Sequence, residues 1–179
     1  MAFFDLPAPE QMSPEARAAL EEYRRYRKAD TPARTWHVYG RVPGIVEARL
    51  KACMDLSETA PFSWESKMVA VMLIAHARKC QTCFGASRGE LAKLGFDDEA
   101  LNGMCADPDS IPLKERDKKF VRHALRVATD SANITQNDLR EMEASGFSKD
   151  EILQIIGFGA YWAMNTIFSQ TALAGLLDE

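Results

Sequence analysis

Hydrophobic residues recur along most of the chain at intervals of three and four positions, the period of an amphipathic helix. The clearest segment is 68–75, where eight consecutive apolar residues predict a helix buried on every face. No segment alternates apolar and polar residues for long enough to predict a strand. The chain is therefore expected to be all-α.

Helix-capping residues, prolines and glycines set the expected helix boundaries. The N-terminal signals are Ser13 with Pro14, Pro43, Ser63, Asp97, Pro112, Thr135 and Ser148. The predicted helices span 14 to about 29, 45–60, 64 to about 95, 98 to about 104, 112 to about 130, 136–145, and the residues from 149 onward. Gly146 is expected in the left-handed conformation that ends many helices, and 30–42 are expected to form a turn and an irregular connection.

Composition places the chain among ordinary globular proteins. Its 179 residues match the length of one domain, so a single domain over 1–179 is predicted. A hydrophobic content of 46% is enough for a sizeable core, and a net charge of −4 gives no broad basic surface for nucleic acid or anionic lipid. The first residues lack a basic segment followed by an apolar one, which favours a cytoplasmic protein.

The C-terminal segment 152–177 carries no charged residue, which raises the question of a membrane span. Gly157, Gly159 and Asn165 interrupt it, and no basic flank supplies an orientation signal. A helix that is apolar on most of its circumference can instead cover the core on one side and a neighbouring subunit on the other. We therefore expect a homo-oligomer that does not interact with membranes.

The four cysteines are too few for a disulfide-built scaffold, but two of them form a CxxC motif, Cys80 and Cys83. Two thiols three positions apart on a helix lie about one turn from each other and can exchange between dithiol and disulfide. The alternatives are half of a zinc site, for which the chain has no second CxxC, and two unconnected buried thiols. Redox chemistry is the favoured interpretation of the CxxC motif. Cys53 and Cys105 are expected to be structural thiols.

If the helix from 64 to about 95 is continuous, polar residues around the motif share one of its faces. Glu65, His76, Cys80, Cys83 and Ser87 would then form one polar seam, with His76 seven positions, close to two turns, before Cys83. An imidazole beside a thiol can accept its proton and supply thiolate at neutral pH. The competing interpretations are a hydrogen-bonded structural His76 and a Glu65 that merely complements the helix dipole.

The ordered series of motifs resembles the carboxymuconolactone decarboxylase and alkylhydroperoxidase D-like superfamily. The matching segments are the apolar helix from 68, CQTCFGAS at 80–87, LGFDDEAL at 94–101, and GFSKDEI at 146–152 leading to 161–165. The resemblance implies an all-α fold with the CxxC on a central buried helix, assembled as a trimer or hexamer. The chain departs from the peroxidase pattern at three positions, where Met68, Ser87 and Thr82 replace a glutamate and two histidines.

The resemblance also implies an antioxidant activity, thiol-dependent reduction of hydroperoxides. Cys83 would be the peroxidatic thiol and Cys80 the resolving thiol, with a dithiol protein as reductant and no metal or other cofactor. His76 and Glu65 are our candidates for the missing proton relay, inferred from their spacing. The alternatives are a lactone decarboxylase or isomerase of the same superfamily, which needs no CxxC, and a non-catalytic thiol redox sensor.

Overall fold

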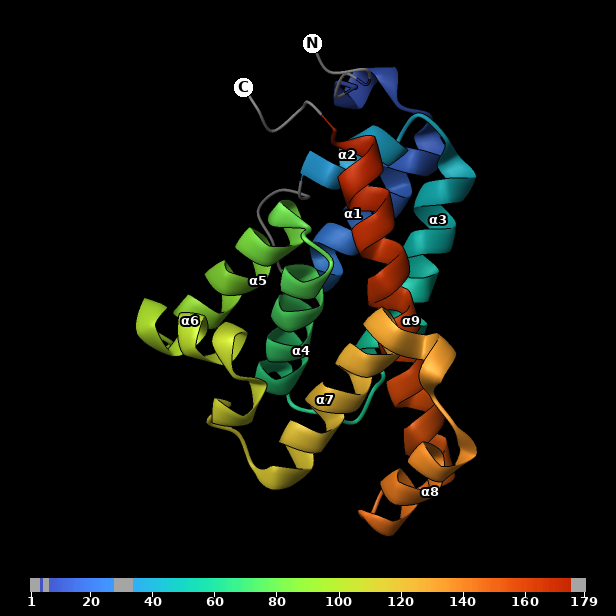
Figure 1. Ribbon diagram of the computed structural model, residues 1–179. Helices are drawn as coiled ribbons and strands as arrows, with labels where there is room; N and C mark the ends of the chain where they lie inside the picture. The colour runs from blue at the N-terminus through green and yellow to red at the C-terminus, as the bar shows by residue number, and fades with distance from the viewer. Residues whose placement is uncertain (1–3, 5–6, 28–33, 175–179) are drawn as a thin grey trace. The chain divides into compact units, whose positions relative to one another are not determined.

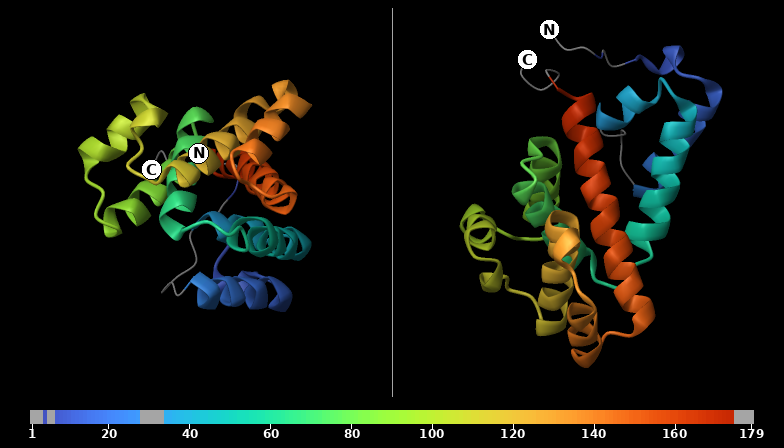
Figure 2. Two further views of the ribbon diagram at one scale, coloured as in Figure 1. Left: turned by 90° about the horizontal axis from the view of Figure 1, so that it is seen from below. Right: turned by 45° about the vertical axis from the view of Figure 1, so that its right-hand side comes forward.

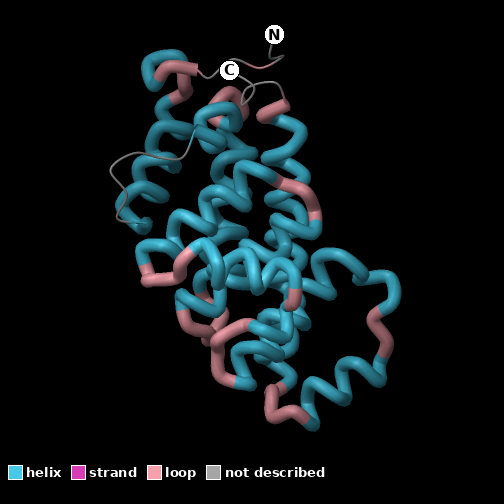
Figure 3. Tube along the Cα trace, turned by 60° about the vertical axis from the view of Figure 1, so that its left-hand side comes forward, coloured by secondary structure: helices cyan, strands magenta, loops and turns pink. Residues whose placement is uncertain are grey.

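The computed structural model describes residues 4, 7–27 and 34–174, and within these residues it contains helices and loops but no strand (Figures 1 and 3). The expected all-α class is confirmed. The α-helices are α1 (Pro14–Arg27), α2 (Arg34–Tyr39), α3 (Pro43–Ala52), α4 (Trp64–Ala77), α5 (Gln81–Lys93), α6 (Asp98–Ala106), α7 (Glu115–Asp130), α8 (Gln136–Ala144) and α9 (Lys149–Ala172). A π-helical turn, Cys53–Glu58, follows α3.

The backbone contacts divide the described residues into two compact units. One comprises the residues up to 55 together with those from 168, and the other comprises 56–167. The helix α9 belongs to the second unit up to Ile167 and to the first from Phe168. The expectation of one domain over 1–179 stays a prediction.

The first unit has its own apolar core, which explains a helix that the sequence did not predict. Trp36 and Tyr39 are buried in this core with Val46 and Leu50. The two aromatic residues are three positions apart, so a helical turn puts both on the same face. For this reason 34–39 form α2, where an irregular connection was expected. The expected turn at 30–32 and the end of the first helix near 29 lie outside the described residues.

The second unit is built around α4, which packs against α5 and α7 (Figures 1 and 2). Residues 66–75 of α4 are all buried, as the apolar run predicted. Phe120 of α7 stacks on Phe62, with ring centroids 3.9 Å apart, and meets the edge of Phe158 from α9 at 5.2 Å. These residues belong to one apolar cluster with residues of α4, so α4, α7 and α9 share a core. Residues of α4 and α9 also contact the cysteine pair.

A glycine allows α9 to lie close to α7. A Cβ atom added at Gly159 would lie 2.7 Å from the carbonyl oxygen of Ala124 and 2.8 Å from Cβ of Val127. Real Cβ atoms do not approach backbone this closely, so the spacing of the two helices depends on the hydrogen atom that glycine carries in place of a side chain.

Most of the expected helix starts are confirmed by side-chain caps. The hydroxyl or carboxylate oxygens of Ser13, Ser63, Asp97 and Ser148 accept hydrogen bonds from backbone N–H groups three residues ahead, at 2.8–3.2 Å. Gly146 has a φ of 92°, as predicted for the end of α8. The expected start at Pro112 is wrong, because α7 begins at Glu115 after the buried Ile111.

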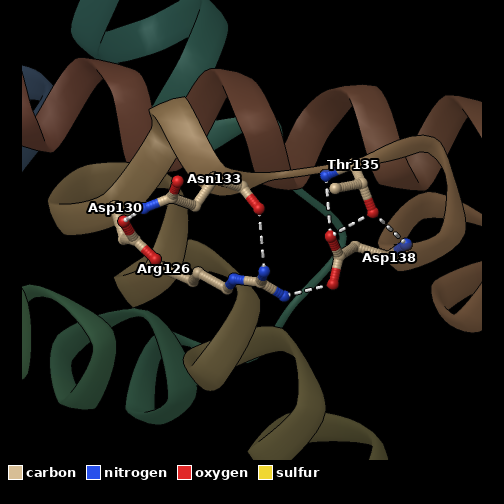
Figure 4. Close-up of polar contacts among 5 residues, drawn as sticks. All are labelled: Arg126, Asp130, Asn133, Thr135 and Asp138. Atoms are coloured by element: carbon tan, nitrogen blue, oxygen red, sulfur yellow. Dashed lines mark hydrogen bonds and ion pairs between the residues drawn. The ribbon is translucent and has the colours of Figure 1, made fainter.

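The corner between α7 and α8 is held by a polar network (Figure 4). Asp138 and Thr135 cap each other at the start of α8, and Arg126 of α7 forms an ion pair with Asp138. Arg126 also donates to the Asn133 carbonyl at 3.1 Å, and the Asn133 amide donates to Asp130 at 2.6 Å. The hydrogen bond from Arg126, together with those from Thr135, holds the pKa of the Asp138 carboxyl well below its usual range.

None of the described helices combines the length and the apolar character needed to cross a lipid bilayer.

Candidate active site

The predicted continuous helix from 64 to about 95 is wrong, because the chain turns between α4 and α5. Lys79 adopts the left-handed conformation, with φ of 59°. The backbone N–H of Cys80 donates to the Ala75 carbonyl at 2.8 Å, and that of Lys79 donates to the His76 carbonyl at 3.0 Å. This pair of bonds is a Schellman motif, which ends a helix and usually has glycine at the left-handed position. The motif places Cys80 in the connection and Cys83 in the first turn of α5.

The break removes the proposed polar seam. Glu65 lies in the first turn of α4, eleven residues before His76, which is about 16 Å of helix rise. The structure therefore places Glu65 at the far end of α4 from the cysteine pair. His76 lies in the last turn of α4, exposed to solvent, with its ring 5.5 Å from that of Phe84. His76 lies beside the CxxC motif because the chain turns between α4 and α5, and not because His76 and the cysteines share a face of one helix.

The two cysteines of the motif are free thiols in contact with each other. Cys80 is the N-cap residue of α5, and both cysteines are buried in a small apolar cluster with Ala75, against which Phe84 packs. The first turn of a helix presents backbone N–H groups and a partial positive charge, which favour an anion. A thiol at this position is therefore stabilised in its thiolate form.

The thiol of Cys80 has a pKa lowered to about 7. The largest cause is a hydrogen bond from the Cys83 thiol, and burial of the sulfur opposes it. The backbone N–H groups of Cys83 and Thr82 and the positive charge of Arg78 lower the pKa further. The lowered pKa favours the thiolate form of Cys80 near neutral pH.

Two neighbouring residues of α9 reach the motif from more than 80 positions away. The Asn165 amide donates to the Cys83 sulfur at 3.9 Å, and the Thr166 hydroxyl accepts from Nε of Arg78 at 2.7 Å. Arg78 also donates to the Ala128 carbonyl of α7 at 2.9 Å. These bonds hold a guanidinium beside the thiolate. The sequence analysis missed Asn165 and Thr166 as site residues, and the only local signal was their polar character within the uncharged C-terminal segment.

A cavity of about 660 Å³ opens beside Cys80. We call its less polar lining residues, Ala75, Phe84, Cys105 and Ala106, the wall. We call its exposed polar lining residues, His76, Lys79, Gln81 and Asn102, the rim. Cys83 is not among the lining residues. Cys105, expected to be structural, lies on this wall, and burial raises the pKa of its thiol. Cys53 is buried in the first unit. Cys80 contributes to the lining of this cavity, although only 1% of its surface is exposed.

The three positions that depart from the peroxidase pattern have structural environments of their own. Met68 is buried in the core of the second unit. The Ser87 hydroxyl is buried and donates to the carbonyls of Cys83 and Phe84 at 2.9 and 3.0 Å. Because the single hydroxyl proton of Ser87 is donated to these carbonyls, it is not available to the thiols. Thr82 contributes its backbone N–H to Cys80.

Within the part of the chain that the structure describes, no group of three or more histidine, cysteine or acidic side chains is placed to hold a metal ion.

The chain has the alkylhydroperoxidase D-like fold, as the resemblance in sequence predicted. Among solved structures, it is similar to the alkylhydroperoxidase AhpD core of a peroxidase-related protein from Ralstonia eutropha JMP134. The identity is 15%, the match covers 94% of this chain and 88% of that chain, and the TM-score is 0.79.

It is also similar to a peroxidase-related protein from Silicibacter sp. TM1040. In this case the identity is 18%, the match covers 97% of this chain and 88% of that chain, and the TM-score is 0.77. No protein-family model and no curated protein matches the sequence. At these identities the likeness establishes the fold.

Proposed function

We propose that the Cys80–Cys83 pair reduces organic hydroperoxides. The observation that carries the proposal is the Cys80 thiol, which has a lowered pKa, lines a cavity and contacts a second thiol. A sulfur of this kind combines nucleophilicity at neutral pH with access for a substrate and a built-in resolving partner. Both solved structures of similar fold are described as peroxidase-related proteins, which supports the same class of reaction.

The proposed reaction begins with attack of the Cys80 thiolate on the terminal oxygen of the hydroperoxide. The O–O bond breaks, Cys80 becomes a sulfenic acid, and the alkoxide leaves and takes up a proton. His76 lies on the cavity rim, where its imidazolium can supply that proton. Cys83 sulfur then attacks Cys80 sulfur, the S–O bond breaks, and water leaves as the disulfide forms. A dithiol protein reduces the disulfide by exchange and returns the two electrons.

The proposed order of attack is the reverse of the one that the sequence resemblance implies. Cys80 lines the cavity and carries the lowered pKa, whereas Cys83 is the hydrogen-bond donor to it. Cys83 as the peroxidatic thiol is the alternative. Glu65 receives no role, because it lies at the opposite end of α4. Assembly as a homo-oligomer and a cytoplasmic location stay predictions.

Trapping the sulfenic acid tests this order and the proposal together. After one equivalent of tert-butyl hydroperoxide in the presence of dimedone, Cys83→Ser should carry the dimedone adduct on Cys80, as measured by peptide mass mapping. Cys80→Ser should carry little adduct on Cys83. The opposite pattern would assign the attack to Cys83, and the absence of adduct from both variants would contradict hydroperoxide reduction.

A further inference from the structure

The rim of the cavity is polar but carries no acidic residue. Beside the apolar wall, the rim offers two amides, Gln81 and Asn102, and two groups that can be positively charged, His76 and Lys79. These four side chains provide hydrogen-bond donors and positive charge for an anion. Its volume of about 660 Å³ lies within the range of small-molecule sites.

Among the described residues, no hydrogen bond or ion pair engages the side chain of Lys79, in contrast to the two arginines of this region. Arg88 donates to Asn102 at 2.8 Å and forms an ion pair with Asp98, and Arg78 donates to Thr166 and Ala128. Among the described residues, no carboxylate forms an ion pair with Lys79, and its side chain is exposed. The ammonium group is therefore available to a ligand.

The backbone at Lys79 gives an independent reason to assign its side chain a role. Its φ of 59° lies in the left-handed region, which is unfavourable for a residue that carries a Cβ atom. Glycine would satisfy the same Schellman motif without that cost. Strained backbone of this kind gathers at functional sites, where the side chain is needed. Here the strained residue is adjacent to Cys80 and on the rim of its cavity.

We propose that the preferred substrates are organic hydroperoxides with an apolar body and a carboxylate, and that Lys79 binds the carboxylate. This inference rests on the proposed hydroperoxide reduction. The Cα atoms of Lys79 and Cys80 are about 3.8 Å apart, and the ammonium sits on a flexible four-carbon stem. A substrate whose peroxide reaches Cys80 along Phe84 and Ala106 can therefore place its carboxylate at Lys79.

A pair of hydroperoxides that differ only in charge tests this proposal. Cumene hydroperoxide carrying a para-carboxylate is compared with its neutral methyl ester, and the second-order rate constant for oxidation of the protein is measured for each. An exposed ion pair contributes up to about fivefold, so the wild type should react about two to five times faster with the carboxylate. Added salt should reduce the preference, because it screens the charges.

Substitutions at Lys79 should change the ratio of the rate constants for the carboxylate and the ester. Lys79→Gln should react equally with the two substrates, and Lys79→Glu should prefer the ester. The matched control is Lys93→Gln, since Lys93 lies on α5, pairs with Glu90 and does not line the cavity. Circular dichroism melts establish that each variant folds.

The outcomes separate the two proposals. If the wild type reduces both substrates at equal rates, or if Lys79→Gln keeps the preference, the role of Lys79 is wrong and hydroperoxide reduction stands. If the wild type reduces neither substrate, and also fails with tert-butyl hydroperoxide, the proposed function itself is wrong.

Discussion

Replacing Cys80 with alanine should slow hydroperoxide reduction at least about 10³-fold, because the variant lacks the sulfur that attacks the peroxide. The rate is measured as loss of tert-butyl hydroperoxide with dithiothreitol as the dithiol reductant, corrected for the reaction without protein. Cys105→Ala is the matched control. It removes a thiol from the same cavity wall, but burial raises the pKa of that thiol and keeps it protonated. Its rate should stay within about twofold of the wild type.

The pH dependence of the same reaction follows from the lowered pKa of Cys80. The wild-type rate should rise with pH to a plateau, with a midpoint about 7, since only the thiolate reacts. In a single-turnover measurement, Cys83→Ala should shift the midpoint upward because the main hydrogen-bond donor to the thiolate is lost. Cys83→Ser retains a donor and should shift it less. Full activity in Cys80→Ala, or equal midpoints in all three proteins, would contradict the account.

Gly159→Ala should lower the free energy of unfolding by about 1–3 kcal/mol, the usual cost of forcing an extra methyl group into a close-packed core. The added Cβ would lie 2.7 Å from the Ala124 carbonyl oxygen and 2.8 Å from Cβ of Val127, so α7 or α9 has to move. The measurement is urea unfolding followed by circular dichroism at 222 nm.

The control is Gly157→Ala on the same helix. At Gly157 the nearest atom to a new Cβ is Cδ2 of Leu56 at 3.1 Å, the end of a flexible and largely exposed side chain. Alanine favours a helix over glycine by up to about 1 kcal/mol, so this variant should be as stable as the wild type or slightly more stable. Equal stabilities for the two variants would mean that α7 and α9 do not approach each other closely at Gly159.

Local signals in the sequence predicted much of the fold. The cap residues act on N–H groups only a few positions away, and a run of eight apolar residues has one stable environment, the core. Ser63 and the segment 68–75 therefore behave as expected in α4. The start of α7 was predicted wrongly at Pro112, and the helix begins at Glu115, after the buried Ile111.

The turn at Lys79 could not be predicted in this way. Left-handed helix ends are marked in sequences by glycine or asparagine, and here a lysine occupies the position. The missed turn made the spacing of His76 to Cys83 appear decisive. Glu65 was assigned to the site by its helix face alone, without regard to its distance along the helix axis. A lysine at a left-handed helix end is unusual, and the proposed binding role of its side chain would explain why Lys79 occupies that position.

The remaining parts of the site depend on contacts between distant segments. Asn165 and Thr166 reach the motif from α9, and Asn102 and Cys105 complete the cavity from α6. Periodicity along one helix carries no information about which other helix lies beside it. The lowered pKa of Cys80 likewise follows from the geometry of the turn, which brings the Cys83 thiol and two backbone N–H groups to its sulfur.

The most direct test of the proposed function is to map the thiols of the wild-type protein after reaction with one equivalent of tert-butyl hydroperoxide. The account predicts one molecule of tert-butanol for each Cys80–Cys83 disulfide, formed faster than free cysteine reacts in the same buffer, with Cys53 and Cys105 still reduced. Oxidation spread over all four cysteines, or consumption of peroxide no faster than by free cysteine, would contradict it.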